Sequence, residues 1–249
     1  MNESTLNKMK QMKFLGMSRA FQTNLESGQL QKMTPDEMIS FLVESEWDDR
    51  HNRNIDRHIK NAKFRYFASI ENLNYNENRN LDKNQMMRFG DCTFIKNHEN
   101  ILITGSTGVG KSFIATALGY QACSLGYKVL YASTSKLFSK LKISKADGSY
   151  MKEISRIEKL DLLILDDFGL HAFENQHRSA LMEIIEDRHG KGSLIITSQI
   201  PVNLWYEVIG EQTMADAILD RIIHGAHRIE LMGESLRKIK EISKMEFLN

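Results

Sequence analysis

The sequence predicts an α/β protein, a parallel sheet covered by helices, preceded by a small all-helical part. Two observations carry this prediction. From Asn100 onward, short apolar runs alternate with amphipathic segments of helical spacing, which is typical of strands buried on both faces between crossover helices. Residues 4–65 show helical spacing instead. We therefore expect a helical N-terminal domain over 1–68 and an α/β domain over 69–249.

The helical part contains one helix with a clear start. In "TPDEMISFLVESEWDDR", Thr34 can serve as N-cap, Pro35 as the first helical residue and Glu37 as the capping-box acid. The aromatic residues fall at helical spacing with other apolar residues. We therefore expect them to form the core of this part and not a stacking platform for single-stranded nucleic acid. They are Phe14, Phe21, Phe41, Trp47, Phe64, Tyr66 and Phe67.

Between about 71 and 97 the pattern loosens into an Asn-rich, charged stretch with a short helical candidate at Gln85–Phe89, which indicates a linker. The α/β part follows. Strands are expected at 101–104, 128–133, 162–167, 193–199 and 227–231. Helices are expected near 111–125, 134–144, 150–159, 176–189, 201–209 and 214–226.

The stretch "GSTGVGKS" matches the phosphate-loop pattern G-x-x-x-x-G-K-[ST] and lies between an expected strand and an expected helix. Its glycines let backbone N–H groups surround phosphates, and the helix N-terminus adds its positive dipole end. Lys111 supplies a positive charge, and the Ser112 hydroxyl can bind Mg²⁺. The residues expected to bind ATP are Gly105, Ser106, Thr107, Gly108, Val109, Gly110, Lys111, Ser112 and the adjoining Phe113.

A second run, "LLILDDFG", ends a buried strand with two acids and a glycine. Asp166 would emerge at the carboxyl end of the strand beside the phosphate loop, where it can hold Mg²⁺ directly or through water. Asp167 would accept a proton from the water that attacks the γ-phosphate. The pairing of this strand with the phosphate loop predicts a site that hydrolyses ATP with Mg²⁺.

The strand "SLIITSQ" ends in polar side chains. In nucleoside triphosphatases with an additional strand, this strand lies between the other two. Thr197 and Gln199 are therefore expected to reach the γ-phosphate or the attacking water, and a simple polar turn is the alternative reading of these residues.

Composition restricts the partners. The chain has 33 Lys and Arg against 32 Asp and Glu, a net charge of +1, so any attraction to nucleic acid must come from local clusters. The two cysteines are not closely spaced, which favours packed thiols in a reduced cytoplasmic setting. No run reaches the roughly 18 apolar residues that span a bilayer, so we expect a soluble protein with no membrane contact.

One basic cluster lies in "DRHNRNIDRHIKNAKFR", where basic residues recur three or four apart on one helix face. Such a stripe fits contact with DNA phosphates, which reads no base, although a solvated face is the commoner fate of such runs. The candidate DNA-binding residues are Arg50, Arg53, Arg57, Lys60, Lys63 and Arg65. Further basic candidates, which could line the inner surface of an oligomer, are Lys136, Lys140, Lys142, Lys145, Arg188 and Lys191.

These motifs resemble the AAA+ ATPases of the DnaC/IstB branch, and specifically the IstB-type helper proteins of insertion-sequence transposition. The resemblance covers nearly the whole chain. It rests on "GSTGVGKS", "LLILDDFG", "EIIEDRHGKGSLIITSQIPVNLWYEVIG", "ADAILDRIIHGAHRIELMGESLR" and "KMKQMKFLGMSRAF". The fourth of these stretches discriminates far better than the phosphate loop, which many unrelated proteins share.

The resemblance implies roles that spacing alone does not assign. Arg221 in "LDRIIH" looks like the arginine finger that reaches the nucleotide of a neighbouring subunit, with a surface salt bridge as the alternative. Arg237 looks like a second basic contact, to phosphate or to a partner. The chain leaves no room for the C-terminal helical lid that usually carries the second sensor arginine. A core without that lid implies that isolated monomers hydrolyse ATP poorly and that homo-oligomerisation activates them.

IstB-type proteins bind duplex DNA with little sequence preference, oligomerise on it with ATP, and recruit or stimulate a transposase. The resemblance implies the same function for this chain. Two alternatives stay open: a DnaC-like helicase loader that grips single-stranded DNA, and a small-molecule kinase with the same phosphate loop. Asp167 departs from the AAA+ pattern, which most often has Glu there, and the shorter side chain implies either a closer water or slow turnover before assembly.

Overall fold

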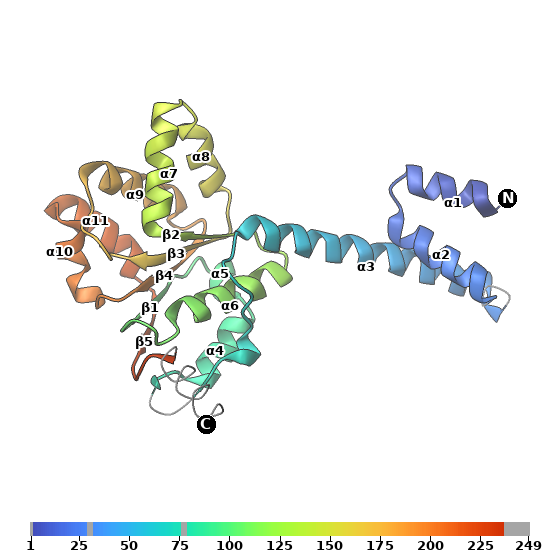
Figure 1. Cartoon of the computed structure of the whole chain (residues 1–249), viewed down its shortest axis with the longest axis horizontal. Coiled ribbons are helices and arrows are strands. Elements are labelled where there is room, and N and C mark those ends of the chain that lie inside the picture. Colours follow the sequence, from blue (N-terminus) through green and yellow to red (C-terminus); the bar gives the residue numbers. More distant parts are fainter. Residues whose placement is uncertain (1, 29–31, 76–78, 237–249) are drawn as a thin grey trace, which may run out of the picture. The chain divides into compact units, whose positions relative to one another are not determined.

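The computed structural model describes residues 2–28, 32–75 and 79–236, and its contacts divide the chain into two compact units, Met1–Arg57 and His58–Asn249 (Figure 1). The division falls within a helix, before the boundary expected at residue 68. The last turns of that helix belong with the second unit because Ile59 and Ala62 pack into its hydrophobic core. Arg237 and the region expected to lack a lid lie outside the described residues.

The first unit contains α1 (Asn2–Gln11), α2 (Leu15–Ser27) and most of α3 (Pro35–Ala62). α3 begins as the sequence predicts. The Glu37 amide donates to Thr34 Oγ1 (3.3 Å), and the Thr34 amide donates to Glu37 Oε2 (2.8 Å). This reciprocal pair satisfies two N–H groups at the start of the helix.

A buried carboxylate joins α2 to α3. Glu46 of α3 accepts hydrogen bonds from the amides of Gly16 (2.9 Å) and Met17 (3.1 Å) in the first turn of α2. An anion is favourable there because the first N–H groups of a helix lack partners within the helix and carry its positive dipole end. Gly16 is required because a Cβ would lie 2.3 Å from the main-chain oxygen of Ser45. The two helices therefore touch backbone to backbone.

The aromatic core expected in the helical part is incomplete, although Phe14 and Phe21 are half-buried. Phe41 and Trp47 are exposed on α3. Helical spacing shows which residues share a face but not what covers that face, so spacing alone did not predict this exposure. Beyond α3 the other aromatic residues pack on a helix of the second unit, α6 (Lys111–Ser124), through the ring pairs Phe64 with Tyr120, Tyr66 with Phe113 and Phe67 with Tyr120.

The second unit is built on a five-stranded sheet with the order β2-β3-β4-β1-β5, in which neighbouring strands are parallel. Each strand matches an expected one, and β4 lies between β3 and β1 as predicted. The strands are β1 (Ile101–Gly105), β2 (Val129–Ser133), β3 (Leu162–Phe168), β4 (Ser193–Ser198) and β5 (His227–Leu231).

Helices cover both faces of this sheet (Figure 1). Alternate residues of β1 enter two separate cores, with Ile101 and Ile103 in one and Leu102 in the other. This is the predicted fold class. The helix expected near 214–226 ends at Ile223, and Gly225 follows with a left-handed φ of 69°. The remaining elements are η2 (Ile70–Asn72), α4 (Lys83–Gly90), α5 (Thr93–Lys96), α7 (Thr134–Ala146), α8 (Tyr150–Glu158), α9 (Asn175–Arg188), η4 (Val202–Leu204), α10 (Trp205–Ile209) and α11 (Gln212–Ile223).

The two cysteines, Cys92 and Cys123, are buried free thiols, and burial raises the pKa of each to about 12. Thiols with such pKa values stay protonated near neutral pH and react slowly. The expectation of packed thiols is therefore confirmed. In the part of the chain that the structure describes, no helix combines the length and the apolar character needed to cross a membrane.

Candidate nucleotide and magnesium site

The phosphate loop joins the end of β1 to the start of α6 at the carboxyl edge of the sheet. Gly108 and Gly110 have φ angles of 87° and 99°, and Gly110 is the N-cap of α6. Residues with a Cβ rarely adopt this left-handed region, at a cost of about 1 kcal/mol or more. The glycines of the motif thus permit the sharp turn that ends at a helix N-terminus, the arrangement that favours bound phosphate.

Lys111, the first residue of α6, folds back over the loop. Its Nζ donates to the main-chain oxygens of Gly105 and Ser106, each at 2.8 Å, and the residue is only 6% exposed. Carbonyl oxygens carry only partial charge, so an anionic phosphate is a stronger partner for this ammonium. The charge lies where the sequence predicts that phosphate binds.

The next residue of the loop meets the metal-binding candidate of β3. Ser112 Oγ donates to Asp166 Oδ1 at 2.7 Å. A hydroxyl and a carboxylate are oxygen ligands of the kind that Mg²⁺ prefers, and this ion usually takes few protein ligands beside water and phosphate oxygens. Among the described residues no group of three or more His, Cys, Asp or Glu could hold a metal by itself. Ser112 and Asp166 together therefore fit Mg²⁺ bound with a nucleotide.

Asp166 is fully buried and is held by further hydroxyl groups. The Tyr131 hydroxyl on β2 donates to Asp166 Oδ2, and Thr197 Oγ1 on β4 donates to Oδ1. Thr134 Oγ1 donates to the main-chain oxygen of Asp166 at 2.9 Å. Burial, followed by the hydrogen bond to Asp166, raises the pKa of Tyr131 above its ordinary value, which keeps its hydroxyl protonated as a donor.

Asp167 lies in a bulge of β3. Leu165 pairs with Ile196 and Phe168 with Ser198, so β3 has one more residue than β4 between these pairs. Asp167 has a left-handed φ of 58°, and its amide donates to Thr197 Oγ1 at 3.1 Å. In a regular strand successive side chains point to opposite faces of the sheet. The bulge interrupts this alternation at Asp167.

The two residues predicted at the end of this strand have different surroundings: Thr197 lies within β4, and Gln199 follows its last residue, Ser198. Thr197 is completely buried, and its hydroxyl lies between the Asp167 amide and the Asp166 carboxylate. Gln199 Oε1 accepts a hydrogen bond from Thr107 Oγ1 of the phosphate loop at 2.6 Å. Gln199 therefore reaches the loop, whereas Thr197 contacts the two aspartates.

Sequence reasoning missed Arg79. This buried residue donates from Nη2 to the main-chain oxygen of Val109 in the phosphate loop (2.5 Å) and from Nη1 to that of Asn74. Burial lowers its pKa from the usual value. The guanidinium supports the loop from the linker that precedes the sheet. A lone arginine in the Asn-rich stretch "NYNENRN" was the available signal, and it carries no recognisable spacing.

Arg221 lies on α11. Its Nη1 donates to the main-chain oxygen of Ala217 (2.8 Å), and its Nη2 lies 3.4 Å from Glu186 Oε1. Its side chain is 29% exposed. The surface salt bridge considered from the sequence is thus present within one chain.

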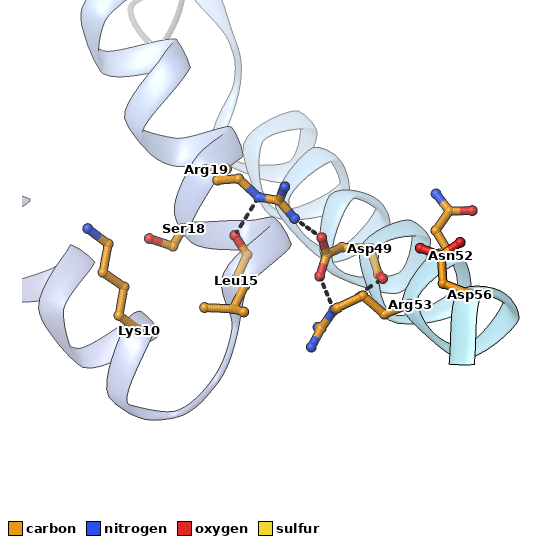
Figure 2. Close-up of a pocket in the computed structure, with 8 residues that line it drawn as sticks. All are labelled: Lys10, Leu15, Ser18, Arg19, Asp49, Asn52, Arg53 and Asp56. Carbon is orange, nitrogen blue, oxygen red and sulfur yellow. Dashed lines mark hydrogen bonds and ion pairs between the residues drawn. The ribbon is translucent and has the colours of Figure 1, made fainter. Parts of the chain in front are cut away.

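The predicted basic stripe on α3 is partly neutralised. Arg50 Nε lies 2.6 Å from Glu46 Oε1, and Arg53 Nε lies 2.6 Å from Asp49 Oδ2. Figure 2 shows that Arg19 of α2 also turns toward Asp49, in a pocket between the helices of the first unit. Glu46 lies one turn before Arg50, outside the stretch from which the stripe was predicted.

The later residues of the stripe have other surroundings. Arg57 donates to the neutral side chain of Asn54 (2.5 Å), and Lys60 and Lys63 are exposed. The Arg65 guanidinium lies over the Tyr131 ring, 5.7 Å from its centre. Arg65 is therefore beside the residue that holds Asp166, and the structure separates it from the α3 stripe because α3 ends at Ala62.

Two of the further basic candidates have partners within the chain. The prediction that Arg188 lines an oligomer surface is wrong, because this residue is 2% exposed. Its guanidinium donates to the main-chain oxygens of Ile157, Leu160 and Ser193. Lys140 is paired with Glu153 on α8.

A family model described as IstB-like ATP binding protein matches residues 7–244. The chain belongs to this IstB-like family. Among its IstB-like relatives, the putative insertion sequence ATP-binding protein y4pL of Sinorhizobium fredii is 42% identical over 234 residues, which cover 94% of this chain and 96% of the relative. The insertion sequence IS21 putative ATP-binding protein of Pseudomonas aeruginosa is 26% identical over 236 residues, with coverage of 95% and 89%.

The IstB-like chain is also similar to solved structures. The DnaC helicase loader aligns with a TM-score of 0.57 and 19% identity, covering 66% of this chain and 96% of that one. DnaA from Aquifex aeolicus bound to AMPPCP aligns with a TM-score of 0.59 and 21% identity, covering 74% and 56%. At these identities the likeness concerns the fold, and it agrees with the predicted α/β core of a parallel sheet covered by helices.

Proposed function

We propose that this IstB-like protein is a Mg²⁺-dependent ATPase that assembles on duplex DNA and recruits a transposase to it. The contact between Ser112 and Asp166, beside the Lys111 ammonium, carries the ATPase part of the proposal. The occurrence of its relatives in insertion sequences supports the transposition part. Buried free thiols fit a reduced cytoplasmic setting.

In the proposed reaction the phosphate loop and the N-terminus of α6 bind the triphosphate, and Lys111 neutralises part of its charge. Ser112 and Asp166 would hold Mg²⁺, which when bound supplies positive charge to the phosphate oxygens. Asp167 accepts a proton from the attacking water. Its left-handed backbone, which the hydrogen bond to Thr197 supports, separates it from the metal-binding acid.

We infer that Gln199 senses the γ-phosphate through a contact with the phosphate loop. Its amide oxygen accepts a hydrogen bond from Thr107 of that loop. Thr197 is assigned a positioning role, since its hydroxyl bonds both aspartates and the residue is fully buried. Phe113 is assigned a packing role beside the phosphate loop, because its ring stacks on the ring of Tyr66.

Arg221 is proposed to complete the nucleotide site of a neighbouring copy. Its pair with Glu186 is partly exposed, and such pairs contribute only about 0.2–1 kcal/mol. Exchanging this partner for a phosphate group of the neighbour therefore costs little, and the guanidinium would stabilise charge that develops during hydrolysis. Isolated protomers are accordingly expected to hydrolyse ATP slowly.

The proposed DNA contact is the second half of α3. Arg57 is bonded to a neutral amide and Lys60 is exposed, so their charge is available to phosphates. Such contacts read no base, which fits binding to duplex DNA of any sequence.

The test is ATP hydrolysis, measured as phosphate release without DNA, with single-stranded DNA and with duplex DNA of equal length. We expect duplex DNA to stimulate hydrolysis, and turnover per protomer to rise with protein concentration. Stimulation by single-stranded DNA alone would instead favour the DnaC-like loader. Phosphoryl transfer to a small molecule, with no DNA effect, would favour the kinase.

A further inference from the structure

The first half of α3 exposes a ridge of large apolar side chains. Ile39, Val43 and Trp47 are 62%, 54% and 63% exposed and recur every four residues, so they lie on one face of the helix. The ring of His51, one turn further on, stacks on Trp47 at 5.0 Å between centres. Glu46 lies beside the ridge on the helix surface and is buried against α2. The ridge side chains themselves stay more than half exposed, so within the described residues this part of α3 is not covered.

Charge is segregated along the same helix. Between Thr34 and Asp49 the chain has no Lys or Arg, and the ridge is accompanied by exposed carboxylates. The nearest basic residue, Arg50, is neutralised by Glu46. The basic residues proposed for DNA contact follow only in the second half. The exposed acids of the first half are Asp36, Glu37, Glu44 and Asp48.

We propose that this surface, the α3 acidic face formed by Ile39, Val43 and Trp47 with Asp36, Glu44 and Asp48, binds a basic, apolar segment of the transposase. The inference rests on the proposed function and adds where the transposase binds. Large apolar side chains surrounded by charge are typical of protein binding sites, and tryptophan is among the residues that contribute most to them.

Charge decides the class of occupant. Phosphate groups of DNA or of an anionic membrane are repelled by the carboxylates, so neither fits the face. A second copy of this face would bring two sets of carboxylates together, which opposes symmetric pairing. A protein that cuts and joins DNA needs basic surfaces to hold phosphates, and Lys or Arg side chains beside its apolar residues complement Asp36, Glu44 and Asp48.

The test uses the full chain and the purified transposase of the same insertion sequence, with no DNA present, and measures their equilibrium affinity. Trp47→Ala removes the largest apolar group, and Glu44→Lys reverses one charge. Met87→Ala and Glu207→Lys are the matched controls, because both residues are exposed but lie elsewhere. Each variant is also assayed for self-association by ultracentrifugation and for DNA-stimulated ATP hydrolysis.

We expect Trp47→Ala and Glu44→Lys each to weaken transposase binding by about tenfold or more, with hydrolysis, self-association and both controls unchanged. High salt should weaken wild-type binding and affect Glu44→Lys less. Unchanged affinity in both variants would overturn this inference alone. Loss of self-association in the variants would overturn it in favour of a second copy. Failure of the wild-type chain to bind the transposase would overturn the proposed recruitment as well.

Discussion

The hydroxyl of Tyr131 donates a hydrogen bond to Asp166 Oδ2, while Ser112 and Thr197 donate to the other oxygen of the same carboxylate. A carboxylate bonded at both oxygens is fixed in rotation. Groups that orient a metal ligand in this way commonly change metal affinity by tenfold to a hundredfold when they are removed. Tyr131 therefore belongs to the proposed metal site although it lies on a different strand from Asp166.

Tyr131→Phe should weaken Mg²⁺ affinity about tenfold, because the ring remains but one hydrogen bond to a charged group, about 1.5–3 kcal/mol, is lost. The measurement is binding of a fluorescent ATP analogue as Mg²⁺ is titrated, which needs no turnover. Tyr120→Phe, on α6, is the control. Equal Mg²⁺ dependence in wild type and Tyr131→Phe would show that the hydroxyl has no role in metal binding.

Lys111→Ala should abolish nucleotide binding. The ammonium is held over the phosphate loop by two main-chain oxygens, and its removal leaves the triphosphate without its closest protein charge. Equilibrium binding of the ATP analogue is the measurement, and Lys128→Ala on the other end of the sheet is the control. If Lys111→Ala binds the ATP analogue as tightly as the wild type, this loop does not bind the phosphates of ATP.

Asp167→Asn should bind ATP and assemble but hydrolyse it at least about a hundredfold more slowly, the usual cost of losing a general base. Asn is the best replacement because it tolerates the left-handed backbone found at this position. Phosphate release and nucleotide affinity are measured together, with Asp91→Asn as control. If the variant releases phosphate at the wild-type rate, another residue is the general base. If Asp167→Glu leaves turnover unchanged, the short side chain does not explain slow hydrolysis.

Arg57→Gln combined with Lys60→Gln should weaken binding to duplex DNA and reduce its salt dependence by about two phosphate contacts. The structure selects this pair over Arg53, because Arg53→Gln also removes the ion pair to Asp49 and so disturbs the helical unit. Affinity is measured at several salt concentrations, with Lys8→Gln and Lys10→Gln on α1 as control. If the DNA affinity of the variant depends on salt as strongly as that of the wild type, these basic side chains face solvent and do not contact DNA.

Arg188→Met should lower the free energy of unfolding by roughly 3 kcal/mol, because buried main-chain oxygens lose their hydrogen-bond donors. Chemical denaturation measures this, and Lys191→Met, whose side chain is exposed, is the control. A stable variant with impaired assembly would support the surface role that the burial of Arg188 argues against.

Regular features of this protein could be predicted from its sequence because they depend on local chemistry. The capping box at Thr34 and Glu37 and the five strands follow from residue type and spacing. The position of β4 was expected from the arrangement common to nucleoside triphosphatases with an additional strand. The bulge at Asp167 could not be predicted, since it depends on the register between β3 and β4. Arg79 was missed because its contact with Val109 joins segments thirty positions apart in the chain.

The aromatic residues show a second feature that helical spacing does not predict, namely which apolar faces become buried. Phe64 and Trp47 have the same helical spacing with apolar neighbours, yet the ring of Phe64 stacks on Tyr120 whereas Trp47 is exposed. Periodicity identifies an apolar face, but tertiary packing decides whether the face becomes a core or an interface. The charged neighbours of Trp47 would have been the better guide.

Thr197 couples the two acids of β3. One hydroxyl bonds the side chain of Asp166 and the backbone amide of Asp167, so a change at this one residue of β4 alters the support of both acids together. In the proposed reaction one acid holds Mg²⁺ and the other accepts a proton from the attacking water. The arrangement therefore makes two proposed functions depend on a single side chain.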